Sequence, residues 1–274
     1  MDAKTPLVSV VMSVYNGEQW LTAAIESITH QTYSNWEFII IDDNSNFATK
    51  NILNNYRQNP KFKIITNEIN LGLTKNLNTA IADAHGEFIV RMDADDISKQ
   101  DRIEKQVSFL IQNPGVSVIS SFIECIDENG KQKENWHDDR TATTWGTIKS
   151  ILPWKSCLAH PTVVFRKNIF EKYKYNESQI HSQDLDLWLQ LAADNVIIEK
   201  INEPLLQYRV HNQSITSGSL KKSAFLKIHS IYKIYLKSVW QKKKFNLFNL
   251  KVLIAFKINW VKLILSRIKR LIKS

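Results

Sequence analysis

One segment of this chain constrains its fold more than any other: Phe88-Ile89-Val90-Arg91-Met92-Asp93-Ala94-Asp95-Asp96. Its apolar first half is typical of a buried strand, and its second half places three carboxylates within four residues. Ionised carboxylates this close repel one another, so the cluster is unsuited to a protein core. It indicates a strand end at the surface, where a divalent cation neutralises the charge.

A second expected strand, at 36–41, is also followed by two acids, Asp42 and Asp43. In open α/β sheets, ligands bind outside the carboxyl ends of the strands. Two acidic strand ends therefore predict one site that holds a metal ion and a ligand bound to it. A phosphorylated ligand fits best, because phosphate oxygens are hard ligands for such ions.

The hydrophobic pattern alternates between strand and helix along most of the chain. Strands are expected at 7–15, 36–41, 62–66, 87–92, 116–126, 162–165, 196–200 and 205–210, and helices at 18–30, 46–57, 74–84, 99–112, 143–151 and 184–193. Such alternation is typical of an α/β fold, with a Rossmann-like, mostly parallel sheet flanked by helices.

The charge is distributed unevenly. Residues 219–274 contain 15 Lys and Arg and no acid, whereas residues 1–218 contain 21 basic and 27 acidic residues, a net charge of −6. The chain is therefore expected to have two parts, an acidic globular body at 1–218 and a basic helical tail at 219–274.

Six segments carry a resemblance to a known family. They are Ser9-Val10-Val11-Met12-Ser13-Val14-Tyr15-Asn16-Gly17, Ile41-Asp42-Asp43-Asn44-Ser45, Asn70-Leu71-Gly72-Leu73, Arg91-Met92-Asp93-Ala94-Asp95-Asp96-Ile97, Gln183-Asp184-Leu185-Asp186-Leu187-Trp188 and Tyr208-Arg209-Val210-His211-Asn212. Through them the chain resembles the family 2 glycosyltransferases of the GT-A fold over most of residues 6–216. The resemblance implies inverting transfer of a sugar from a nucleotide diphosphate donor to a hydroxyl group.

The acid cluster and a late histidine are the metal side of the expected site. The resemblance implies that Asp95 is the principal ligand of Mn²⁺ or Mg²⁺ and that Asp93 faces the ribose or a metal-bound water. It also implies that His211 returns to the metal and the diphosphate. The alternatives are an exposed turn with helix-capping acids, above all for Asp96, and a surface histidine.

Four other residues resemble those that contact the nucleotide. Asp43 corresponds to the acid that accepts a hydrogen bond from a uracil or thymine imide, and Tyr15 flanks that base. Asn70 and Lys75 lie where the next loop approaches the nucleotide. UDP or dTDP donors are therefore expected, whereas the alternatives are a packing aromatic, a helix-capping Asn and a solvated Lys.

The acceptor side is expected to centre on Asp184, which the resemblance implies is the general base. Sugar hydroxyls are poor nucleophiles, so a carboxylate must take the proton. An acid favoured by the dipole of a helix N-terminus is the alternative. The chain departs from the family at Gln183, where Glu is common, and His160 resembles an acceptor-side residue.

The tail is expected to form a basic amphipathic helix at 250–274. Leu253, Trp260, Val261, Ile264 and Leu265 fall on one broad face, and no window is apolar enough to span a bilayer. An anionic membrane surface is the expected partner. Packing on the acidic body is the alternative, and nucleic acid is not expected because an apolar face is not needed to follow phosphates.

The function expected is transfer of a sugar to a lipid-linked saccharide in cell-surface polysaccharide biosynthesis, at the inner face of the cell membrane. The cysteines, Cys125 and Cys157, lack metal-type spacing and the chain opens without a secretory leader, which favours the cytoplasm. One alternative is a sugar-phosphate nucleotidyltransferase, although the glycine-rich phosphate loop is missing. The other is a catalytically impaired membrane-binding scaffold, which only Gln183 favours.

Overall fold

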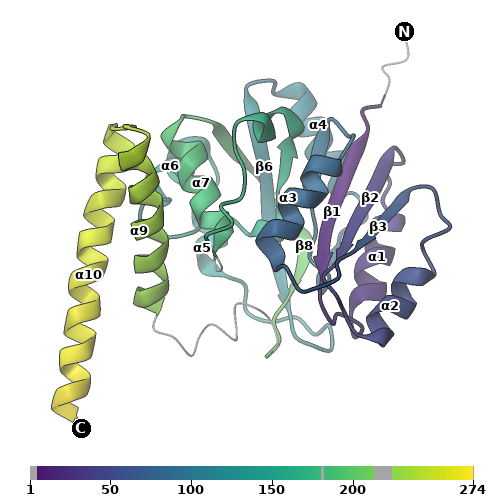
Figure 1. Cartoon of the computed structure of the whole chain (residues 1–274). Helices are drawn as coiled ribbons and strands as arrows, with labels where there is room; N and C mark the ends of the chain where they lie inside the picture. The colour runs from purple at the N-terminus through teal and green to yellow at the C-terminus, as the bar shows by residue number, and fades with distance from the viewer. Residues whose placement is uncertain (1–4, 180–181, 213–223, 274) are drawn as a thin grey trace.

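A single sheet lies at the centre of the computed structural model, which describes residues 5–179, 182–212 and 224–273 (Figure 1). Within these residues the sheet has eight strands in the order β3-β2-β1-β4-β7-β6-β8-β5. The strands are β1 (Val8–Val14), β2 (Trp36–Asp42), β3 (Phe62–Thr66), β4 (Phe88–Arg91), β5 (Ile97–Ser98), β6 (Val116–Ile126), β7 (Val164–Arg166) and β8 (Ile197–Arg209).

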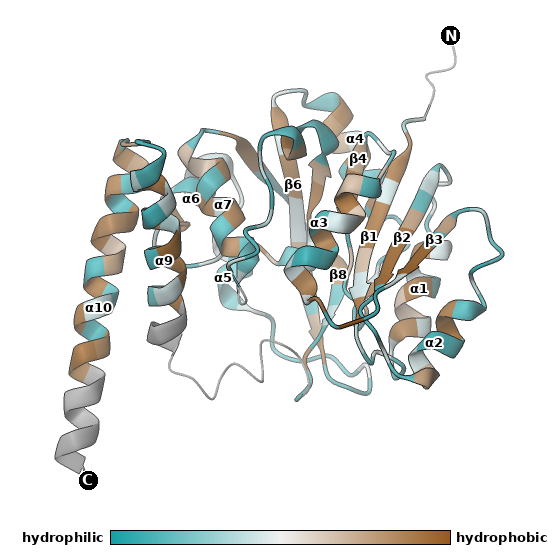
Figure 2. Cartoon of the chain, viewed as in Figure 1, coloured by the Kyte–Doolittle hydropathy of each residue, from teal (hydrophilic) through white to brown (hydrophobic). Residues whose placement is uncertain are grey.

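Helices cover both faces of the sheet. They are α1 (Leu21–Thr29), α2 (Phe47–Asn54), α3 (Leu73–Asp83), α4 (Arg102–Gln112), α5 (His137–Thr141), α6 (Trp145–Ile151), α7 (Gln183–Ala193), α9 (Ala224–Gln241) and α10 (Leu247–Lys273). Alternate strand residues point to opposite faces, so Val10 packs with α1, α2 and α4 whereas Val11 packs with α3, α6 and α7. Figure 2 shows the apolar strands between these two helical layers.

Strand direction decides where the functional residues meet. The strands β3, β2, β1 and β4 are parallel, β7 is antiparallel to both β4 and β6, and β8 is parallel to β6. The strands β1, β2, β4 and β8 therefore all point the same way, and their carboxyl ends lie at one edge.

Gly86 sets the close approach of β4 to β1. Its backbone N–H donates a 2.7 Å hydrogen bond to the hydroxyl of Ser9. A Cβ atom at this position would lie 2.5 Å from the backbone nitrogen of Ser9, which is closer than atoms can approach. Only glycine fits, so the register that brings the two strand ends together depends on it.

The tail forms a helical hairpin, α9 and α10, that packs on α7. The hydroxyl of Tyr235 donates a 2.5 Å hydrogen bond to Oδ1 of Asn249 and lies 3.2 Å from the carbonyl oxygen of Leu189. Lys244 at the turn forms an ion pair of 2.7 Å with Asp194 at the end of α7. The face predicted to be apolar, with Leu253 and Trp260, points away from these contacts and is exposed.

The structure differs from the sequence expectations in a few elements. The two strands expected at 196–200 and 205–210 are one strand, β8, whose register against β6 shifts where Pro204 pairs with Phe122. The expected strand at 162–165 begins later, because Pro161 opens a 3₁₀ turn at His160–Thr162. The domain boundary expected at residue 218 lies outside the residues that the structure describes. The side chains of the tail beyond residue 265 are also outside the described part of the chain. No described helix has both the length and the apolarity that crossing a bilayer requires.

Candidate functional site

Residues singled out by the sequence follow the strands that end at one edge of the sheet. Tyr15 follows β1, Asp43 follows β2, the acid cluster at 93–96 follows β4, and His211 lies two residues after β8. Helix α7 runs back toward the start of β8, so its own first turn, with Asp184, lies at the same edge. The α/β alternation therefore gathers these side chains from five separate segments.

The acid cluster is compact. One oxygen each of Asp93, Asp95 and Asp96 can be chosen so that all three lie within 4.8 Å of one another. Asp96 is only 1% exposed, and its Oδ1 accepts a 2.8 Å hydrogen bond from the backbone N–H of Arg209. Burial, followed by the charges of Asp95 and Asp93, raises the pKa of Asp96 well above its usual range.

These residues fit a divalent cation. They offer hard carboxylate oxygens, which Mg²⁺ and Mn²⁺ prefer. The buried Oδ2 atom of Asp96 has no hydrogen-bond partner among the described residues, and a cation or its bound water would satisfy it. Nε2 of His211 lies 2.9 Å from Oδ2 of Asp95, so the late histidine does reach the cluster. The ring of Trp20 packs on His211 with centroids 4.2 Å apart.

Arg91 lies between the acid cluster and Asp184 in the electrostatics of this edge. Its side chain is buried beneath the cluster and forms an ion pair with Asp93. It is also close enough to Asp184 to lower the pKa of that carboxyl group, against the larger effect of burial, which raises it. The charge of Asp93 raises the same pKa. The charges of Arg91 and Asp93 therefore both act on Asp184, which indicates that the three groups interact electrostatically at this edge.

The first turn of α7 holds Asp184 half-buried. Ser182 precedes the helix with φ of 52°, a left-handed conformation that turns the chain into α7. Gln183, the residue where the family commonly has Glu, is 7% exposed. The site therefore carries one carboxylate at this helix start that is partly open to solvent.

Asp43 organises the loop at 67–72. Its Oδ1 accepts hydrogen bonds from the side-chain amide of Asn67 at 2.8 Å and from the backbone N–H of Leu71 at 2.7 Å. Its Oδ2 accepts one from the N–H of Gly72, whose φ of 85° favours glycine. Burial raises the pKa of Asp43, but these hydrogen bonds outweigh it and leave the pKa below its usual value.

The other predicted residues lie in different surroundings. Tyr15 is 56% exposed beside the β2 end, and Lys75 is exposed on α3. Asn70 donates a 3.4 Å hydrogen bond to the backbone oxygen of Asp43. His160 is buried, with Nε2 2.7 Å from the hydroxyl of Tyr175, and burial together with the charge of Arg91 lowers its pKa well below the usual range. His160 is therefore a neutral residue beneath the site.

Comparison with known proteins assigns the family. The model of glycosyl transferase family 2 matches residues 9–174. The chain belongs to glycosyltransferase family 2. An uncharacterized glycosyltransferase of Methanocaldococcus jannaschii is 36% identical over 242 residues, which cover 87% of this chain and 81% of that protein. The Escherichia coli protein UDP-Glc:alpha-D-GlcNAc-diphosphoundecaprenol beta-1,3-glucosyltransferase WfgD is 31% identical over 219 residues, or 79% of this chain and 82% of the relative.

Solved structures show that this glycosyltransferase has the GT-A fold. TarS of S. aureus in complex with UDP-GlcNAc aligns with a TM-score of 0.66 at 20% identity, and covers 82% of this chain. The aligned part is 65% of that structure, a little under two thirds of it. The mannosyltransferase PcManGT from Pyrobaculum calidifontis, in complex with GDP-Man and Mn²⁺, aligns with a TM-score of 0.63 at 15% identity over 97% of this chain and 76% of that one.

Three residues at the candidate site, Arg91, Arg209 and Trp20, are not among those predicted from the sequence. Arg91 was part of a recognised segment, and a lone charge in an apolar strand is a signal that could have identified it. Arg209 donates a 2.9 Å hydrogen bond to the backbone oxygen of Asp95, and its guanidinium lies over the ring of Trp20. Neither contact has a local sequence signal, because both join residues from distant segments.

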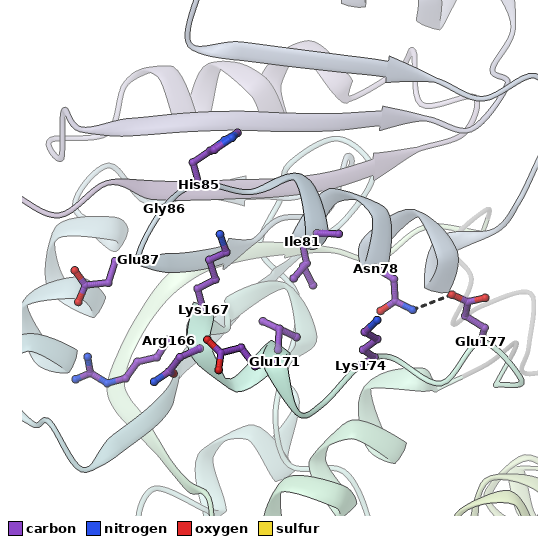
Figure 3. A pocket seen from close by; sticks show the side chains of 13 residues that line it. Asn78, Ile81, His85, Gly86, Glu87, Arg166, Lys167, Glu171, Lys174 and Glu177 are labelled. Atoms are coloured by element: carbon purple, nitrogen blue, oxygen red, sulfur yellow. Dashed lines mark hydrogen bonds between the residues drawn. The ribbon is translucent and has the colours of Figure 1, made fainter.

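A cavity of about 720 Å³ lies at the other edge of the sheet (Figure 3). It is lined by residues just before β4, including His85 and Glu87, and by Arg166 and Lys167 at the end of β7. Arg166 and Lys167 donate hydrogen bonds to backbone carbonyl oxygens, which occupy their charged groups. The acid cluster is at the opposite strand ends, so this cavity is separate from the candidate site.

Replacing Asp43 by Asn is expected to destabilise the glycosyltransferase by about 1–3 kcal/mol at pH 7, because an amide nitrogen would face a buried N–H donor. The lowered pKa means that Asp43 stabilises the fold above its usual pKa and loses this effect as the pH falls through the folded value. Urea denaturation should therefore show a wild-type advantage that is constant from pH 7 down to about pH 4 and narrows as the pH falls below the usual pKa of 3.8. An equal difference at all pH values would contradict this role.

Proposed function

We propose that this enzyme transfers a sugar, with inversion, from a UDP- or dTDP-sugar to a hydroxyl group of a lipid-linked saccharide in cell-surface polysaccharide biosynthesis. The observation that carries the proposal is the meeting of the acid cluster and Asp184 around Arg91 at one sheet edge. One side of this edge offers ligands for a charged diphosphate, and the other offers a proton acceptor. Family membership favours sugar transfer over nucleotidyl transfer.

The donor preference rests on Asp43. Its Oδ2 accepts a hydrogen bond from Gly72, and a carboxylate oxygen can accept more than one. An imide N–H of uracil or thymine is a donor of the right kind, and exposed Tyr15 lies at the neighbouring strand end, where it can cover the ring face. The TarS complex with UDP-GlcNAc supports this choice, whereas the PcManGT complex holds GDP-Man.

In the proposed reaction Asp184 is the general base. The acceptor oxygen forms a bond to the anomeric carbon as the bond from that carbon to the diphosphate oxygen breaks, and the nucleoside diphosphate leaves with the electron pair. The acceptor proton passes to the Asp184 carboxylate. Attack from the face opposite the leaving group inverts the configuration. Arg91 orients Asp93 through their ion pair, and its charge favours the ionised form of Asp184 that accepts the proton.

Asp95, Asp93 and His211 are the residues that we propose hold Mn²⁺ or Mg²⁺. When bound, the cation would offset the negative charge that develops on the leaving diphosphate. Its charge would also favour the ionised form of the three aspartates, which otherwise repel one another. Asn70 and Lys75 are proposed to contact the nucleotide, and buried Gln183 and His160 to shape the acceptor side.

The acceptor and its location are the remaining parts of the proposal. The relative WfgD carries diphosphoundecaprenol in its name, and such a lipid-linked saccharide is presented at a membrane. We propose the same class of acceptor here, used at the inner face of the cell membrane. The division into a catalytic body at 1–218 and a membrane-facing tail at 219–274 is part of this proposal.

Thermal unfolding with a panel of donors tests the proposal. Ligands that bind only the folded state raise Tm, and saturating UDP- or dTDP-sugar with Mn²⁺ is expected to raise it by about 5 °C or more. GDP-mannose and donors without metal should have smaller effects. Equal stabilisation by GDP-mannose would contradict the assignment of Asp43. If a separate assay shows that the bound donor releases no UDP, the scaffold alternative is favoured.

The transfer rate is expected to fall at acid pH. Burial raises the pKa of Asp184 above the usual 3.8, and only the ionised carboxylate accepts a proton. The rate should therefore decline as the pH drops through this raised pKa, at saturating donor. Arg91→Met removes a positive charge that lowers the pKa of Asp184. The transfer rate of this variant should therefore begin to fall at a higher pH than that of the wild type. If Arg91→Met keeps the wild-type Tm and its rate falls at the same pH as that of the wild type, the placement of Arg91 is contradicted.

A further inference from the structure

Over the side chains that the structure describes, helix α10 has two apolar faces, one packed and one exposed. Phe248, Val252, Ala255 and Leu263 are buried, and the first three belong to the same core as α7 and α9. On the other side lies what we term the outer face, whose large side chains are each 37–52% exposed. It consists of Leu250, Leu253, Ile254, Ile258, Trp260, Val261, Ile264 and Leu265.

The spacing of the outer face shows that it is continuous. Leu250, Ile254, Ile258, Val261 and Leu265 follow one another at intervals of three or four residues, which places them on one side of a helix. In Figure 1 α10 is the outermost helix of the hairpin, and Figure 2 shows apolar residues along the part of it that is coloured by hydropathy. Soluble monomers rarely expose so extended an apolar strip without a partner.

Basic residues accompany the outer face. Lys257 lies within it, and Lys251 and Lys262 are exposed beside it. The whole segment 219–274 contains 15 Lys and Arg and no acid. A lysine within an apolar face can bury its methylene stem while its ammonium group stays at a polar interface. The occupant that matches this face must therefore be apolar in depth and anionic at its surface.

We propose that the outer face of α10 docks the enzyme on an anionic lipid surface, with the helix lying in the plane of the interface. This inference names the surface through which the proposed function reaches a lipid-linked acceptor. Because the hairpin is fixed to α7 through Tyr235 and through the Lys244–Asp194 ion pair, docking also fixes the catalytic body near the membrane.

A second copy of the chain is a poorer occupant. Pairing two outer faces would bring Lys251, Lys257 and Lys262 of both copies together, and the tail offers no acid to neutralise them. The acidic body of the same chain does not cover this face, since its contacts with the hairpin are made by the buried side of α10. An anionic bilayer meets both requirements at once.

Co-sedimentation of the full chain with vesicles tests the proposal. Vesicles of phosphatidylcholine containing about 30% phosphatidylglycerol should retain the wild type, and phosphatidylcholine alone should retain much less. The combined variant Ile254→Gln, Ile258→Gln, Val261→Gln should lose at least about tenfold in affinity. Ile111→Gln, which changes an isoleucine of α4 that is 51% exposed, is the matched control and should bind like the wild type.

A second set of variants tests whether binding requires the positive charges beside the outer face. Lys251→Gln, Lys257→Gln, Lys262→Gln should weaken binding to the anionic vesicles by about fivefold per lysine. Lys131→Gln with Lys133→Gln, in the exposed loop after β6, is the control and should have no effect. Failure of the wild type to bind, or unchanged binding of the outer-face variant, would overturn the proposal. So would a wild-type dimer that the outer-face substitutions convert to monomer.

Donor hydrolysis without vesicles separates this inference from the proposed function. All of these substitutions lie outside the site, so the variants should release UDP from a UDP-sugar at the wild-type rate. Intact hydrolysis without vesicle binding would overturn the docking surface alone. Vesicle binding without hydrolysis by the wild type would overturn the proposed function alone.

Discussion

Asp184→Asn is expected to lower the rate of sugar transfer by about 10²–10⁴-fold, because an amide cannot accept the acceptor proton. The substitution is nearly isosteric, and it replaces a carboxyl group whose ionisation is already disfavoured by burial. The fold and the affinity for UDP with Mn²⁺ should therefore be retained. A transfer assay and calorimetry on the same preparation measure both quantities.

Asp101→Asn is the matched control for this prediction. Asp101 is an exposed acid that forms an ion pair with Lys105 on α4. It is not among the residues assigned to the site. Its transfer rate should equal that of the wild type. If Asp184→Asn transfers sugar at the wild-type rate, another group must take the proton, and the assignment of Asp184 is wrong.

Asp95→Asn is expected to abolish the effect of Mn²⁺ on donor binding. Loss of residues that merely orient metal ligands costs about 10–100-fold in metal affinity, so loss of a ligand should cost at least about 100-fold. UDP affinity in the presence of Mn²⁺ should fall to the value measured without metal. Asp95 is half-buried and the substitution keeps a hydrogen-bonding group for His211, so Tm of the metal-free protein should change little.

Titration of UDP into wild type, Asp95→Asn and Asp101→Asn, each with Mn²⁺ and with EDTA, provides the comparison. The wild type and Asp101→Asn should respond to the metal, and Asp95→Asn should not. A metal response that survives in Asp95→Asn would place the cation elsewhere.

Much of the sheet could be predicted because buried strands appear in the sequence as runs of apolar residues. The prediction at 116–126 coincides with β6, and the acidic ends of β2 and β4 lie at one edge of the sheet, as expected. Strand direction could not be predicted for β7, since a three-residue strand with two apolar residues has no pattern that distinguishes one direction from the other. The tail was correctly expected to be helical, but periodicity alone cannot say which of two apolar faces of α10 packs.

The site was predictable where several like residues cluster locally. The acid cluster consists of neighbours in sequence, Asp93, Asp95 and Asp96. The repulsion between their charges can therefore be recognised without knowledge of the fold. The lone charge of Arg91 in an apolar strand is visible in the sequence, but its electrostatic effect on Asp184 is not, because the two residues are distant in the chain. The hydrogen bonds by which Asp43 holds the loop at 67–72 are likewise tertiary, and no periodicity reports them.

A crystal structure with UDP and Mn²⁺, in which anomalous scattering locates the manganese, tests the central claim most directly. We predict that the ion is coordinated by Asp95, that the diphosphate lies beside it, and that the Asp184 carboxylate faces the same space across Arg91. Manganese and UDP bound at another edge of the sheet, or an Asp184 side chain directed away from the diphosphate, would contradict the account.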